Sequence, residues 1–198
     1  MTTAGAQTDP VTLAFGTTTG NAGFGTVTAY TTVGGKFLMY ADEVNGLYCY
    51  TEGTATWAKV ASGTGAGQIS GIDPANIAFV TSWKNRIWFV ERNSTRAWYL
   101  PIGQIAGVAA SIDFGNRFKY GGQLVGVWSW TVDGGSGVDD YLVGISTAGD
   151  VLVYAGSDPT VDFTVRGSWF IGKVPSGRRI ATDVGGDLLL LTAQGILP

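Results

Sequence analysis

Short apolar runs separated by small or polar residues follow one another along most of the chain. The runs are about four to six residues long and rich in Val, Ile, Leu and aromatic residues, while Gly, Asn, Asp and Ser dominate the separators. This pattern is typical of β-strands joined by tight turns. The best helix candidate, 101–110, contains two glycines and lacks a 3.6-residue apolar period. The pattern therefore predicts an all-β fold.

Four segments repeat one plan, in which an apolar run, a short polar turn and a second apolar run form a hairpin. The turns contain Gly46, Gly149 and Gly195 in three of the four, and glycine accepts the positive φ angles of tight hairpins. Corresponding positions in the first strands lie 50, 54 and 47 residues apart, at Phe37, Ile87, Tyr141 and Leu188. A repeat of about 50 residues indicates the four-stranded blade of a β-propeller. A β-sandwich of some 14 strands is the competing fold.

Further apolar runs before and after each hairpin define the blades. Runs at 26–33, 77–83, 124–132 and 179–184 precede the four hairpins, and runs at 56–61, 110–114 and 168–172 follow the first three. We therefore expect blades at 25–75, 76–120 and 121–173, and an incomplete blade at 174–198. Residues 1–24 are an N-terminal extension, in which Val11–Phe15 could supply a strand that closes a four-blade ring. The apolar run Ile196–Pro198 at the end favours instead a piece of a larger propeller.

The charge content changes the expectation for the surface. Apolar residues make up 45% of the chain and charged residues only 14%, compared with about 25% in typical domains. This favours a surface that is partly covered in an assembly, against a monomer kept soluble by Ser, Thr and Gly. The net charge is −3 and the basic residues are scattered, so no specific DNA binding is expected. Neither a signal peptide nor a membrane-inserted segment is predicted.

The residue types needed for common catalytic sites are missing. The chain has no histidine and a single cysteine, Cys49, which excludes Ser-His-Asp and Cys-His catalysis and Cys/His zinc sites. The neighbouring carboxylates Asp42–Glu43 and Asp139–Asp140 point to opposite faces of a strand, so they are interpreted as hairpin ends. The Gly- and Asp-rich loop 133–140 could hold calcium but lacks the EF-hand spacing, and a surface hairpin is favoured. We expect no enzyme activity, cofactor or metal.

Seven tryptophans are the other candidate binding residues. Trp98, Trp128 and Trp130 are selected as a possible interface or glycan platform, because exposed aromatic side chains dominate such surfaces. Trp128 and Trp130 are two residues apart, so a regular strand places them on one face. Packing of these large side chains between blades is the alternative.

Several motifs resemble propeller-bearing tail proteins of short-tailed bacteriophages, which form the nozzle or tube end below the portal. The resemblance covers 76–198 and is carried by WKNRIWFVE at 83–91, AWYLP at 97–101, IDFG at 112–115, YGG at 120–122, WTVDGGSG at 130–137, DYLV at 140–143, VYAGSDP at 153–159 and GGDL at 185–188. Members of that family are usually much longer than this chain.

The resemblance implies a non-enzymatic virion protein, assembled in the host cytoplasm. It would be present in several copies around the tail axis, with six copies expected. It would contact a portal or adaptor ring and fibre or needle proteins, and DNA would only pass through during ejection. A carbohydrate-binding propeller module of a receptor-binding or fibre protein is the alternative. A polysaccharide-cleaving propeller using Asp139 or Asp140 is a third reading.

Overall fold

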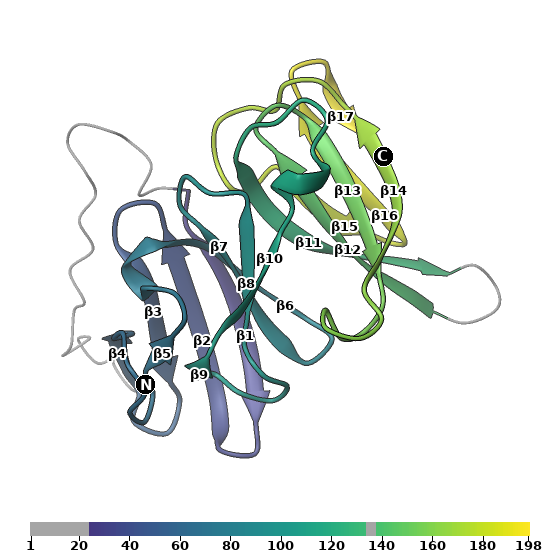
Figure 1. Ribbon diagram of the computed structural model, residues 1–198. Helices are drawn as coiled ribbons and strands as arrows, with labels where there is room; N and C mark the ends of the chain where they lie inside the picture. Colours follow the sequence, from purple (N-terminus) through teal and green to yellow (C-terminus); the bar gives the residue numbers. More distant parts are fainter. Residues whose placement is uncertain (1–23, 134–137) are drawn as a thin grey trace, which may run out of the picture.

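The computed structural model describes residues 24–133 and 138–198, and within these ranges the strands form four small antiparallel sheets in chain order (Figure 1). Each of these four sheets is a meander, because its strands pair in the order in which they follow one another along the chain. The four sheets are arranged as the blades of a four-blade β-propeller. The predicted all-β propeller is therefore confirmed, and the two-sheet sandwich is excluded.

Blades 1 and 2 have four strands each. Blade 1 consists of β1 (Thr26–Thr32), β2 (Gly35–Asp42), β3 (Gly46–Thr51) and β4 (Thr56–Lys59). Blade 2 consists of β6 (Ile77–Trp83), β7 (Arg86–Glu91), β8 (Arg96–Tyr99) and β10 (Ala110–Asp113). A short parallel pair, β5 (Ile69–Ser70) and β9 (Gly107–Val108), joins loops of these two blades.

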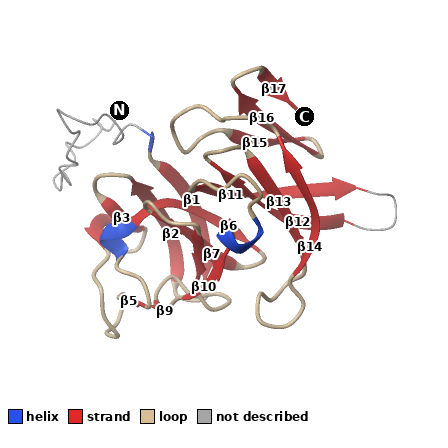
Figure 2. Ribbon diagram, turned by 45° about the horizontal axis from the view of Figure 1, so that its top comes forward, coloured by secondary structure: helices blue, strands red, loops and turns tan. Residues whose placement is uncertain are grey.

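Blade 3 has four strands and blade 4 has three among the described residues. Blade 3 consists of β11 (Leu124–Asp133), β12 (Val138–Ser146), β13 (Asp150–Ala155) and β14 (Thr164–Phe170). Blade 4 consists of β15 (Ala181–Val184), β16 (Asp187–Thr192) and β17 (Gly195–Leu197). No described residue lies in an α-helix, and Figure 2 shows only short helical turns in blue, among them η2 (Pro74–Asn76) and η3 (Gly115–Arg117).

The hairpin turns lie where the glycines predicted them. Gly46, Gly149 and Gly195 have φ angles of +77°, +101° and +123°, the region that favours glycine over other residues. The last strand of blade 3 differs from the expectation, because β14 covers Thr164–Phe170 and not 168–172. Its pairing with β13 runs from Ala155↔Thr164 to Asp150↔Phe170, and the ladder ends where β13 begins.

Buried apolar side chains form three clusters, each between two neighbouring blades. Met39 and Phe89 belong to the cluster of blades 1 and 2, and Val143 and Leu190 to that of blades 3 and 4. Between blades 2 and 3, the buried Phe114 ring packs edge-on against Tyr154, with ring centroids 5.1 Å apart. Full burial of one large apolar side chain stabilises a fold by roughly 1.5–3 kcal/mol. Contacts between blades are therefore a main source of stability.

Blade 1 leaves one face uncovered by the other described blades. Side chains of β1 alternate, and Thr26 and Thr28 face blade 2. Thr26 Oγ1 accepts a hydrogen bond from the Val80 backbone N–H, and the Thr28 hydroxyl donates one to Ser82 Oγ. The opposite face carries Val27, which is 56% exposed.

Blade 4 has an uncovered apolar face as well. Leu188 and Leu190 are buried against blade 3, whereas Leu191 and Ile196 point away from it and are exposed. Leu191 and Ile196 are direct partners in the β16–β17 ladder, so they lie side by side on one face. Both end blades therefore present apolar surface.

Candidate functional site

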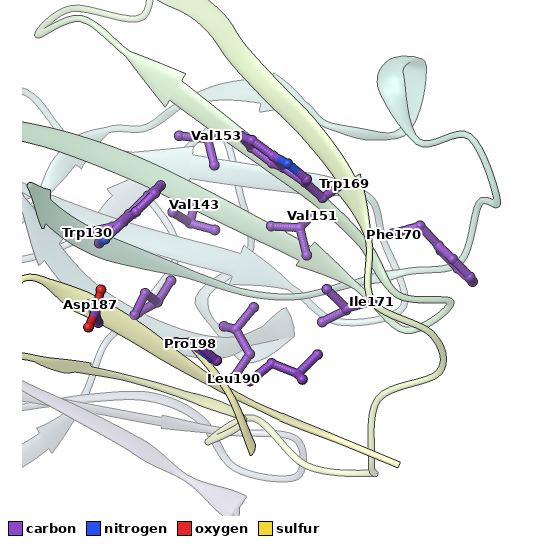
Figure 3. Close-up of a pocket in the computed structure, with 12 residues that line it drawn as sticks. Trp130, Val143, Val151, Val153, Trp169, Phe170, Ile171, Asp187, Leu190 and Pro198 are labelled. Carbon is purple, nitrogen blue, oxygen red and sulfur yellow. The ribbon is translucent and has the colours of Figure 1, made fainter. Parts of the chain in front are cut away.

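An apolar groove of about 370 Å³ lies between blades 3 and 4, and Figure 3 shows the side chains that line it. Blade 3 supplies one wall with side chains of β11 to β14, and blade 4 supplies the other with side chains of β16 and β17. The lining residues are Trp130, Val143, Val151, Val153, Trp169, Phe170, Ile171, Asp187, Leu188, Leu190, Leu197 and Pro198. The groove can take up apolar or aromatic material, and it offers few polar groups for chemistry.

The groove is open because blade 4 has no fourth strand among the described residues. Trp169 on β14 faces the groove from the blade 3 side and is 52% exposed. On the other face of the same strand, Val165 is partly buried in the cluster with Ile112 of β10, the fourth strand of blade 2. The fourth strand of blade 2 thus covers the face of β14 that carries Val165. No described strand of blade 4 covers the face that carries Trp169. The expected closing strand at Val11–Phe15 lies outside the described residues.

The three tryptophans selected from the sequence lie in two places and are all half-buried. Trp98 packs against the cluster of blades 1 and 2, and its indole N–H donates to Glu91 at 3.2 Å. Trp128 and Trp130 pair with Val143 and Tyr141 of β12, so they lie on the same face of β11. The three residues do not form one platform.

Trp128 and Trp130 contact different neighbours on that face. Trp128 reaches across to blade 2, where its ring packs edge-on against Phe79 at 5.3 Å between centroids. Trp130 lines the groove and donates its indole N–H to Gly186 O at 2.9 Å. Trp130 is thus the selected residue that belongs to the groove.

Trp169 and Phe170 were not selected from the sequence, although both are about half exposed. Neighbouring residues of a strand point to opposite faces, and in Figure 3 Phe170 extends away from the other labelled side chains. The Phe170 ring packs on Tyr120, with centroids 4.1 Å apart. The sequence feature that could have identified them is the pair of consecutive aromatic residues on an outer strand. Because their side chains point to opposite faces, only one of the two can face the neighbouring blade.

Arg178 and Arg179 join the start of blade 4 to blades 1 and 3. The Arg178 guanidinium donates to Glu43 Oε1 at 2.6 Å and to the carbonyl oxygens of Leu124 and Val125 at 2.8 and 2.7 Å. Arg179 Nε donates to Gly25 O at 2.6 Å. Both arginines are therefore occupied within the fold.

The carboxylate pair Asp42–Glu43 has structural partners. Asp42 is fully buried and accepts hydrogen bonds from the Tyr40 hydroxyl, the backbone N–H groups of Val44 and Asn45, and the Asn45 amide. Burial raises the pKa of the Tyr40 hydroxyl, and its hydrogen bond to Asp42 raises that pKa further. Asp42 therefore holds the β2–β3 turn, while Glu43 pairs with Arg178.

The second pair and the calcium loop are only partly within the described residues. Asp140 Oδ1 accepts a hydrogen bond from the Thr131 hydroxyl at 2.7 Å, and Lys84 lies 3.8 Å from Asp140 Oδ2. Residues 134–137 of the proposed calcium loop, and the side chain of Asp139, lie outside the described residues. Among the side chains that are described, no group of three or more His, Cys, Asp or Glu residues could hold a metal ion.

Comparisons with known proteins assign no family. No protein-family model matches the chain, and no curated protein matches it. Among solved structures, the chain is similar to a chain from the crystal structure of BBS1N in complex with ARL6DN, with 12% identity and a TM-score of 0.41. The match covers 86% of this chain and 62% of that chain. No helix within the described ranges is long and apolar enough to cross a membrane.

Proposed function

We propose that this chain is a non-enzymatic structural protein of a bacteriophage tail, forming part of the nozzle around the DNA exit channel or a fibre-docking surface. The observation that carries the proposal is the uncovered apolar face at each end of the blade series, represented by Val27 in blade 1 and by Leu191 and Ile196 in blade 4. Leu191 and Ile196 lie side by side on one face of blade 4, and exposed apolar patches mark sites of contact with other protein. The low charge content supports the same reading.

The resemblance to phage nozzle proteins supplies the specific part of the proposal. Several residues that carry it are buried blade-packing positions, among them Trp83, Trp88 and Phe114. Copies around the tail axis would cover the end faces with each other or with portal, adaptor, fibre or needle proteins. The location that we propose is therefore the virion tail.

A DNA channel built from such copies would let DNA slide. The net charge of −3 gives no electrostatic attraction for phosphates. Arg178 and Arg179, the one pair of adjacent basic residues, donate to Glu43 and to backbone carbonyl groups. DNA would therefore pass without sequence-specific binding.

Cryo-electron microscopy of particles from the source lysate tests this function. We expect density for the four described blades in several copies, six in the nozzle form, around the tail axis below the portal. Absence of the chain from purified particles, by density and by mass spectrometry of the same sample, would overturn the proposal.

Carbohydrate binding is the second candidate, because Trp130 and the half-exposed Trp169 line one open groove. Aromatic faces exposed in a groove stack against sugar rings. If the groove binds glycans, Trp169→Ala should weaken binding on a glycan array by at least about tenfold, the effect expected of an aromatic hot spot. Trp98→Ala is the matched control, since Trp98 packs between blades 1 and 2. Equal binding by the wild-type chain and Trp169→Ala would exclude this candidate.

A further inference from the structure

A polar pocket of about 300 Å³ lies where loops of blades 1, 2 and 3 meet the segment that leads into blade 4. Its walls come from the β2–β3, β7–β8 and β12–β13 turns and from the segments that precede β11 and β15. None of its described lining residues also lines the apolar groove. Small-molecule sites in proteins have volumes of about 300–1,000 Å³, so the polar pocket has room for one small ligand.

Exposed polar residues form the rim of the pocket. They are Asn93, Gln123, Thr147, Lys173 and Ser176. Thr147 Oγ1 accepts a hydrogen bond from the Gln123 backbone N–H at 3.0 Å, which joins two of the loops. Apart from that of Thr147, these side chains have no hydrogen-bond or ion-pair partner in the described part of the chain. Two amides, a hydroxyl and an ammonium group are therefore free to bind a ligand.

The charges at the floor of the pocket already balance each other. The Arg178 and Glu43 side chains, 7% and 19% exposed, form an ion pair with nitrogen and oxygen 2.5 Å apart. Arg178 Nη1 also donates to the carbonyl oxygens of Leu124 and Val125, so the guanidinium is not free to grip a ligand. Among the described lining residues, the Lys173 ammonium is therefore the one unpaired charge.

The rest of the floor is aliphatic. Leu124, Val125 and Val174 are buried, and they line the pocket together with Pro175. The described lining contains no aromatic side chain. The pocket thus combines a small aliphatic floor, a rim of neutral amide and hydroxyl groups, and one cation.

This combination selects the chemistry of the ligand. A lysine ammonium forms a strong, charge-assisted hydrogen bond with a carboxylate, and amide and hydroxyl groups both donate to and accept from ligand hydroxyls. Phosphate is typically recognised by an arginine fork or by the N–H groups of a helix N-terminus. Here Arg178 is occupied by Glu43, and no described residue lies in an α-helix. The pocket therefore favours a carboxylate with several hydroxyl groups over a phosphate.

We propose that the polar pocket binds one sugar acid, a hydroxylated ring that carries a carboxylate. Lys173 pairs with the carboxylate, Asn93 and Gln123 bond the hydroxyl groups, and the C–H face of the ring lies on the aliphatic floor. This site goes beyond the structural role proposed above, and its binding does not depend on assembly in a tail. The particle imaging tests that role separately.

NMR titration of the isotope-labelled full chain tests the site, with glucuronate as the sugar acid, glucose as its neutral counterpart and inorganic phosphate as the competing anion. We expect glucuronate to shift the backbone amide signals of Gln123, Thr147 and Lys173 in a saturable way. Glucose and phosphate should each bind at least about tenfold more weakly, because glucose lacks the carboxylate and phosphate lacks the hydroxylated ring. Absence of a saturable shift with glucuronate would overturn the proposal, and so would glucose or phosphate binding as tightly as glucuronate.

Lys173→Gln should weaken glucuronate binding by about tenfold, because it removes the charge and keeps a polar side chain. Lys36→Gln is the matched control, since Lys36 is also exposed but lies at the other end of β2 from the pocket. Trp169→Ala should bind glucuronate like the wild type, because Trp169 lines the separate apolar groove. All three positions are exposed, and the spectrum of each variant without ligand reports its folding. Unchanged affinity in Lys173→Gln, or a loss in either of the other two variants, would assign the binding elsewhere and contradict the proposal.

Discussion

Replacing Arg178 with alanine is expected to lower the free energy of unfolding by about 3–5 kcal/mol, the loss typical of a buried ion pair that loses one partner. The Arg178 and Glu43 side chains are only 7% and 19% exposed, with nitrogen and oxygen 2.5 Å apart. Removing the guanidinium leaves the Glu43 carboxylate and two backbone carbonyl oxygens without their donor. For a chain of this size we expect the melting temperature to fall by about 6–20 °C.

Lys36→Ala is the control for the Arg178 prediction. Lys36 pairs with Glu52 at 3.5 Å, but the two side chains are 67% and 59% exposed. Exposed pairs contribute about 0–1 kcal/mol, so this variant should melt close to the wild type. Thermal unfolding followed by circular dichroism measures both variants. If Arg178→Ala and Lys36→Ala melted at the same temperature, the role of Arg178 in joining blades 1, 3 and 4 would be wrong.

Gly149→Ala is expected to destabilise the protein by about 2–4 kcal/mol, the combined cost of a positive φ and of overpacking. Gly149 has φ +101°, and a methyl group there would lie 1.9 Å from the carbonyl oxygen of Gly172. That oxygen belongs to the backbone and cannot rotate away. The backbone of the loop after β14 would have to move, together with the hydrogen bond from Ile171 N to Gly149 O.

Gly103→Ala is the matched control for Gly149→Ala. Gly103 also has a positive φ, +70°, but a methyl group there would meet nothing within 4 Å. Its expected cost is about 1 kcal/mol, from conformation alone. Urea unfolding of the two variants separates the close approach from the φ effect. Equal midpoints would show that the loop yields to the methyl group, contrary to our expectation.

The alternation of apolar and polar residues carried most of the information about the fold. Strand existence followed from the runs, and hairpin positions followed from Gly46, Gly149 and Gly195, because few other residues accept the backbone angles that these turns need. The extent of β14 could not be obtained in this way. Its first residues, Thr164–Arg166, have no strong apolar run, and pairing with β13 brings them into the sheet.

The candidate site could be predicted only in part. The two-residue spacing of Trp128 and Trp130 correctly placed both on one face of β11. The groove itself needed the position of blade 4 against blade 3, because its walls come from both blades, for example Trp169 of β14 and Leu190 of β16. The same reasoning could not place Trp98, because the position of a residue along its strand does not determine which blade its side chain contacts.

The sequence by itself determined the strand class, the repeat of about 50 residues and the lack of histidine and paired cysteines, because these depend on local residue types and their spacing. The tertiary structure alone decided which surfaces are covered. Arg178 and Glu43 are 135 residues apart and meet only when blade 4 reaches blades 1 and 3. Trp169 is exposed because no described strand covers the outer edge of blade 4. Burial depends on neighbours distant in sequence, which local patterns do not encode.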